Sequence, residues 1–93
     1  RYPGSGYKES SLFWLGNAQY GAKQYREAIT SFRSLLSVAP NHPKAPEALL
    51  SVANTHLELK DPRAARATFN ELIKAYPNSE AAAVGKERLA TLR

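Results

Sequence analysis

The chain has 93 residues, of which 43% are hydrophobic and 23% are charged, with a formal net charge of +5. This composition is typical of one small globular domain and excludes a disordered chain, and the apolar runs are too short to span a bilayer. Cysteine is absent, which excludes disulfides and cysteine-based metal sites.

Apolar residues at helical spacing predict five helices, over about 7–21, 24–38, 44–59, 62–75 and 79–92. Turn and capping signals separate them. Pro40 ends the second helix because proline cannot continue the hydrogen-bond ladder, whereas Pro46 fits the first turn of the third. Asp61 and Pro62 supply the N-cap and first residue of the fourth helix, and Ser79 caps the fifth.

The second and fourth predicted helices carry the same motif. Ala28-x3-Phe32-x7-Pro40 recurs 37 residues later as Ala65-x3-Phe69-x7-Pro77. Repetition at a fixed period of this length indicates stacked supersecondary units. The sequence therefore predicts an all-α domain over 1–93, made of repeat one (about 7–40), repeat two (about 44–77) and a capping helix (about 79–92).

Other positions share the period. Leu15-Gly16, Val52-Ala53 and Leu89-Ala90 follow one another at the same interval, which makes the fifth helix the first of a third unit. Tyr2-Pro3 corresponds to Tyr76-Pro77, so we expect the tail of a preceding repeat there and a fragment of a longer protein. The small residues are expected where paired helices cross, and the phenylalanines between successive hairpins.

These positions resemble the tetratricopeptide pattern W-x2-L-G-x2-Y…A-x3-F…P. The departures are leucine at the tryptophan position, His56 at the tyrosine position, an aromatic displaced by one to Tyr20, and a period of 37 in place of 34. The resemblance implies a right-handed superhelix of antiparallel helical hairpins, with a concave groove that holds a protein partner.

The longer period, the Tyr-Pro-x-Ser turns and Phe13-Trp14-Leu15-Gly16 are similar to the C-terminal domain of the YbgF (CpoB) family of Tol-Pal system proteins, the cell division coordinators of Gram-negative bacteria. That resemblance implies a periplasmic protein that binds TolA and coordinates peptidoglycan synthesis with envelope constriction. It also implies a homotrimer formed by an N-terminal coiled coil outside this sequence, so that the fragment is a monomer or self-associates weakly.

The tetratricopeptide resemblance also implies which residues face a partner. They are the second, fifth, ninth and twelfth positions of each first helix: Ser10, Phe13, Asn17, Tyr20, Glu47, Leu50, Asn54, Leu57, Val84, Glu87 and Thr91. Asn17 and Asn54 are equivalent, and an amide can donate and accept at once, as a peptide backbone requires.

Two further features bear on the predicted groove. Phe13 and Leu50 stand where other members carry the lysines that bind a terminal carboxylate, so we expect an internal segment or helix as ligand. Trp14 is adjacent to the groove, and packing or a rim contact is favoured over a central anchor.

No catalytic, cofactor-binding or metal-ligating pattern is present in the sequence, so we expect no enzyme. His42 and His56 are interpreted as structural. Two alternatives remain open: a nucleic-acid-binding surface driven by the positive charge, and a purely structural or oligomerising scaffold. The basic residues are interleaved with acidic ones, which favours solvated helix faces over the nucleic-acid surface.

Overall fold

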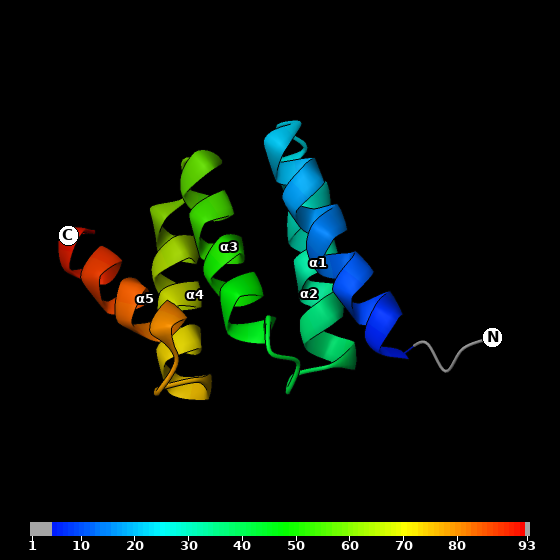
Figure 1. Cartoon of the computed structure of the whole chain (residues 1–93). Coiled ribbons are helices and arrows are strands. Elements are labelled where there is room, and N and C mark those ends of the chain that lie inside the picture. The colour runs from blue at the N-terminus through cyan, green and yellow to red at the C-terminus, as the bar shows by residue number, and fades with distance from the viewer. Residues whose placement is uncertain (1–4, 93) are drawn as a thin grey trace.

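The computed structural model describes residues 5–92, with side chains from Ser10 onward. Five helices follow one another: α1 (Ser5–Gly21), α2 (Tyr25–Val38), α3 (Ala45–Glu58), α4 (Pro62–Ala75) and α5 (Glu80–Thr91) (Figure 1). No strand occurs within residues 5–92, so the predicted all-α helical repeat is confirmed. The repeat tail expected at Tyr2-Pro3 lies outside the described residues.

Local signals set the helix ends where they were predicted. The Asp61 side chain accepts a hydrogen bond from the Ala64 amide (3.2 Å), and Pro62 opens α4. The Ser79 hydroxyl accepts from the Ala82 amide (3.0 Å) at the start of α5. Each cap satisfies one of the backbone donors that a helix N-terminus leaves unpaired.

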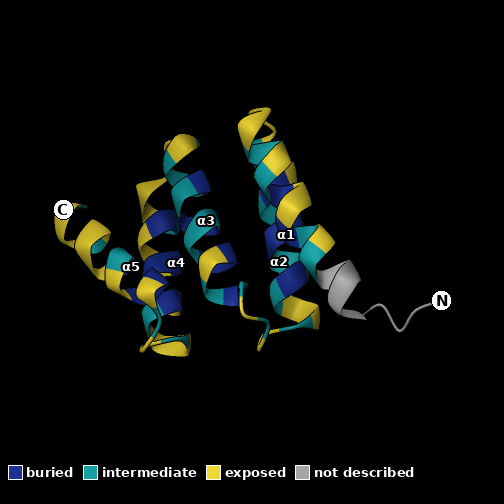
Figure 2. Cartoon of the chain, viewed as in Figure 1, coloured by how far each residue is buried: buried dark blue, intermediate teal, exposed yellow. Residues whose placement is uncertain are grey.

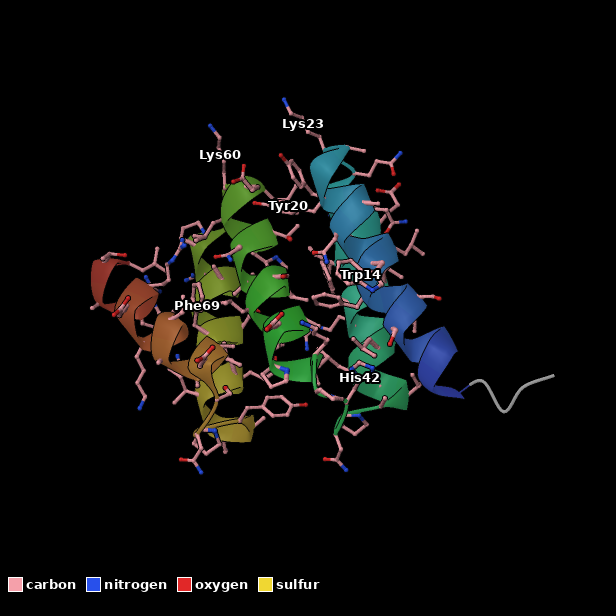
Figure 3. The ribbon with its side chains drawn as sticks, in the orientation of Figure 1. Trp14, Tyr20, Lys23, His42, Lys60 and Phe69 are labelled. Carbon is pink, nitrogen blue, oxygen red and sulfur yellow. The ribbon has the colours of Figure 1, made fainter. Side chains whose placement is uncertain are left out.

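The turns inside the two hairpins share a backbone conformation at one equivalent residue. Lys23 and Lys60, 37 residues apart, adopt positive φ angles of 65° and 61°. Both lie at the same end of the molecule (Figure 3). Each helical hairpin therefore closes through a left-handed residue that is not glycine, at a steric cost of about 1–2 kcal/mol.

The helices form two layers. In Figure 1, α1 and α3 lie in front of α2 and α4, and α5 continues the front layer beyond α3. Helix α3 packs on both α2 and α4, and α5 packs on α4 and more sparingly on α3. Helix α3 thus contacts the second helix of its own hairpin, α4, and that of the preceding hairpin, α2, while α5 contacts the second helix of the preceding hairpin.

The core lies between successive hairpins, where the two phenylalanines were predicted (Figure 2). Phe32 is fully buried among residues of α1, α2 and α3, and Phe69 among residues of α3, α4 and α5. Burying a phenylalanine contributes about 1.5–3 kcal/mol. Phe32 lies on Gly16: a Cβ at that glycine would approach its ring carbons to 2.7 Å.

Two members of the predicted repeat are not buried. Leu15 is 47% exposed, although its equivalent Val52 is buried. Val52 packs in the cluster around Phe32, while no described helix covers the corresponding side of α1. Ala90 is exposed for a similar reason. Its equivalent Ala53 packs against α4, whereas no described helix covers the corresponding side of α5. The register of the repeat holds, but burial also needs a neighbouring helix.

Polar contacts join the two repeats on the side of α2 and α4. The Arg33 guanidinium donates to both carboxylate oxygens of Glu71 (2.9 and 3.1 Å). The Tyr76 hydroxyl donates to the Pro40 carbonyl (2.7 Å). Both contacts link corresponding parts of successive units, so they help to set how one hairpin stacks on the next.

A polar pair replaces an aromatic inside repeat one. The Ser31 hydroxyl donates to the Gln19 side-chain oxygen (2.6 Å) between α2 and α1. Gln19 occupies the position that His56 takes in repeat two. The position that is aromatic in the pattern thus forms a polar contact with α2 in repeat one.

None of the helices described here is long and apolar enough to cross a lipid bilayer.

Candidate binding groove

A broad hollow lies on the layer formed by α1, α3 and α5. Its volume is about 500 Å³, and its lining comes from all three helices and from the residue before α3. The lining residues are Phe13, Trp14, Asn17, Lys44, Glu47, Leu50, Ser51, Glu80, Ala81 and Val84.

A smaller hollow of about 150 Å³ continues the first between α1 and α3. It is lined by Asn17, Tyr20, Ser51 and Asn54. Asn17 and Ser51 border both hollows, so the two hollows adjoin, and together we call them the groove. Seven of the eleven residues predicted to face a partner line it: Phe13, Asn17, Tyr20, Glu47, Leu50, Asn54 and Val84.

The other four predicted residues lie elsewhere. The Ser10 hydroxyl lies 3.3 Å from His42 Nε2, beside the loop between α2 and α3. Leu57 packs against the cluster around Phe69. Glu87 and Thr91 are exposed on α5, beyond both hollows. The groove therefore ends before the last turn of α5, because α5 is tilted away from α3 (Figure 1).

The wall of the groove at α1 combines a buried and an exposed aromatic. Phe13 is only 6% exposed and packs edge-on against Phe32, with 6.0 Å between ring centroids. Trp14 is 62% exposed and stands edge-on to Phe13 at 5.3 Å (Figure 3). Phe13 thus supports the wall, and Trp14 offers the larger apolar surface to anything that enters.

Asn54 carries an unsatisfied oxygen in the narrow part of the groove. Its Oδ1 atom is buried and has no hydrogen-bond partner among the described side chains and backbone. A buried acceptor left unpaired costs about 1–3 kcal/mol. Asn17 borders the same hollow, so amides from equivalent positions of neighbouring repeats both line it.

Tyr20 spans from α1 to α3 beside these amides (Figure 3). Its hydroxyl donates to a Glu58 carboxylate oxygen at 3.3 Å, and its ring meets that of Tyr25 edge-on. Partial burial, and then the Glu58 charge and hydrogen bond, raise the pKa of Tyr20 above its ordinary value of 10.0. The phenol therefore stays neutral and acts as a donor at this end of the groove.

The opposite end is charged. Lys44 Nζ lies 3.6 Å from a Glu47 carboxylate oxygen and 5.6 Å from the centroid of the Phe13 ring. Glu80, at the start of α5, borders the same hollow. The prediction that the groove lacks the clamp lysines concerned the Phe13 and Leu50 positions. Lys44 lines the groove from a different position, directly before the first residue of α3.

Sequence reasoning did not place five lining residues in the groove: Trp14, Lys44, Ser51, Glu80 and Ala81. The sequence predicted Trp14 to be adjacent to the groove but not to line it. Lys44, Glu80 and Ala81 lie at helix beginnings, where a position count within the helix gives little guidance. Their position beside the turns that follow Pro40 and Pro77 was the available signal for them.

The two histidines lie in different settings, His42 in the loop before α3 and His56 within α3. His42 Nδ1 accepts a hydrogen bond from the Lys44 amide (3.0 Å), which gives it a structural role in the loop. His56 is half-buried, and this burial lowers its pKa below 6.5. No group of three or more His, Cys, Asp or Glu within the described residues is placed to hold a metal ion.

A comparison with known protein families matches residues 14–80, more than two-thirds of the chain, to the tetratricopeptide repeat. No curated protein matches the chain. Repeats of this kind stack helical hairpins and generally mediate protein–protein interactions. The repeated motif, the stacked hairpins and this match together show that the chain belongs to the tetratricopeptide repeat family.

Proposed function

We infer that the groove binds a segment of another protein and that the domain catalyses no reaction. The observation that carries this is that Asn17 and Asn54 border the same narrow hollow, while the Asn54 side-chain oxygen has no hydrogen-bond partner among the described residues. With the Asn54 amide turned toward the hollow, a peptide N–H placed there would supply the missing donor. Each such hydrogen bond contributes about 0.5–1.5 kcal/mol, and apolar contact with Trp14, Leu50 and Val84 supplies the rest of the affinity.

We further propose that the partner is TolA and that the domain acts in the periplasm of a Gram-negative bacterium. In this role it links Tol-Pal constriction of the envelope to peptidoglycan synthesis during cell division, within a homotrimer. The Tyr-Pro-x-Ser turns, the 37-residue period and Phe13-Trp14-Leu15-Gly16 support this assignment.

The test is calorimetric titration of the domain with the periplasmic part of TolA. Replacing Asn17 and Asn54 with alanine should weaken binding about tenfold, from the loss of two hydrogen bonds. The melting temperature should not fall, because Asn54→Ala removes a buried unpaired acceptor. Unchanged affinity would refute the role of the amides, and no binding by the parent protein would refute TolA as partner.

The nucleic-acid alternative has less support. Arg33 is paired with Glu71, and the groove is bordered by two carboxylates and one lysine. Binding to DNA or RNA needs cations gathered along one path.

A further inference from the structure

The charge of the groove has the opposite sign to that of the whole chain. The chain carries a formal net charge of +5. The residues that line the groove include two carboxylates, Glu47 and Glu80, and one cation, Lys44. Complementary charge steers partners and selects among them. The net charge of the whole chain would attract an acidic ligand, but the charge of the groove disfavours one.

The two carboxylates line the same part of the groove. Glu47 and Glu80 both border the large hollow, and both also border an adjoining hollow of about 200 Å³ formed with Pro43, Pro46 and Ser79. They therefore stand on the boundary between two depressions that are open to solvent. Only Glu47 has a cation near it, at 3.6 Å, and no described Lys or Arg lies within ion-pair distance of Glu80.

The same hollow places an apolar surface beside these carboxylates. Trp14 is 62% exposed, and Leu50 and Val84 contribute aliphatic walls. The exposed indole, largely uncovered within the described chain, offers a contact for an apolar side chain and for the stem of a lysine or arginine.

We propose that the groove is selective for a protein segment that carries a lysine or arginine beside a large apolar residue. The cation lies between Glu47 and Glu80, the apolar side chain lies against Trp14, and the backbone reaches Asn17 and Asn54. This inference rests on the proposed function, because it names the chemistry of the segment that the groove holds.

A random peptide library displayed on phage and selected on the domain tests it. Selected peptides should be enriched in Lys or Arg adjacent to aromatic or aliphatic residues. Synthetic copies of the selected peptides should bind the Glu47→Gln, Glu80→Gln double variant about fivefold more weakly. The Lys44→Gln variant should bind them more tightly, because it removes the competing cation.

Glu27→Gln is the matched control, since this exposed glutamate lies in the first turn of α2, on the layer away from the groove, and it should leave the affinity unchanged. Peptides that need Trp14 and the two asparagines but lack basic residues, or that ignore the double variant, would overturn the inference and leave the proposed function standing. A selection that yields no peptide dependent on these three residues would overturn both.

Discussion

Phe32 lies so close to the backbone of Gly16 that a Cβ atom on that residue would stand 2.7 Å from two carbons of its ring. The contact joins the two helices of the first hairpin and belongs to the cluster that also receives α3. A fully buried ring in such a cluster has little room to move, since protein interiors are close-packed. The first prediction follows from this contact.

Gly16→Ala should lower the free energy of unfolding by about 1–2 kcal/mol, because overpacking against Phe32 outweighs the better helix propensity of alanine. Chemical denaturation measures the change. Gly21→Ala is the control: nothing lies within 4 Å of a Cβ there, so stability should stay level or rise. Equal effects of the two substitutions would contradict the packing argument.

Lys60→Val should destabilise the domain by about 1–2 kcal/mol, because a β-branched residue is strained at a positive φ. Lys60→Gly should not, since glycine adopts this conformation freely. Lys74→Val, on the exposed surface of α4, controls for the loss of a lysine. Thermal unfolding of the three variants separates the effects, and a similar loss at both lysine positions would argue against strain at the turn.

The Arg33–Glu71 pair should contribute little, although its geometry is bidentate. The two side chains are 40% and 48% exposed, so solvent screens the attraction. A double-mutant cycle with alanine should give a coupling energy of about 0.2–1 kcal/mol at low salt. The coupling should fall further at about 1 M salt. A coupling that salt does not alter would mean that packing, not charge, joins these residues.

Stability should fall as the solution becomes acidic, in part because of His56. Burial lowers the pKa of His56 in the folded state, so the unfolded chain takes up the proton first. The stability contributed by neutral His56 is complete above pH 6.5 and is lost as pH falls through the lower folded pKa.

Unfolding measured from about pH 8 to about pH 5 should therefore show a smaller loss in His56→Gln than in the parent protein. Glutamine already stands at the equivalent position in repeat one, as Gln19. Identical pH profiles would rule out a contribution from His56.

Trp14 should report on occupation of the groove, because it is the single tryptophan of the chain and is 62% exposed. A bound segment that covers it should shift its emission to shorter wavelength and reduce quenching by acrylamide. Tyr20→Phe, which removes the hydroxyl contact with Glu58 but leaves Trp14 in place, should show the same spectral change at saturation. Binding without any change in the emission would place the partner elsewhere.

Periodicity was enough to predict the architecture. The five helices begin and end within a few residues of their expected bounds, because proline, the Asp61 cap and the Ser79 cap act locally. Phe32 and Phe69 were placed correctly because the period of the motif assigns them to the same layer. Periodicity alone does not determine burial, which also depends on neighbouring helices. Leu15 and Ala90 match buried residues in the repeat, yet both are exposed because no described helix lies against them.

The groove was harder to predict for a related reason. Counting positions along a helix identified Asn17, Leu50 and Val84, which lie inside helices and not at their first residues. It also selected Glu87 and Thr91, since a count cannot show that α5 tilts away from α3. The count did not identify Lys44 and Glu80, because they lie at helix beginnings, where the geometry of the loop determines what a side chain faces.

Side-chain contacts join the two repeats both behind the groove and inside it. Arg33 with Glu71, and the Tyr76 hydroxyl with Pro40, hold the rear of the two hairpins at a set spacing. On the front layer the Tyr20 hydroxyl donates to Glu58 between α1 and α3, and Ser10 lies beside His42. A segment bound in the groove therefore meets the Tyr20–Glu58 hydrogen bond directly, whereas the contacts on the α2 and α4 side lie beyond its reach.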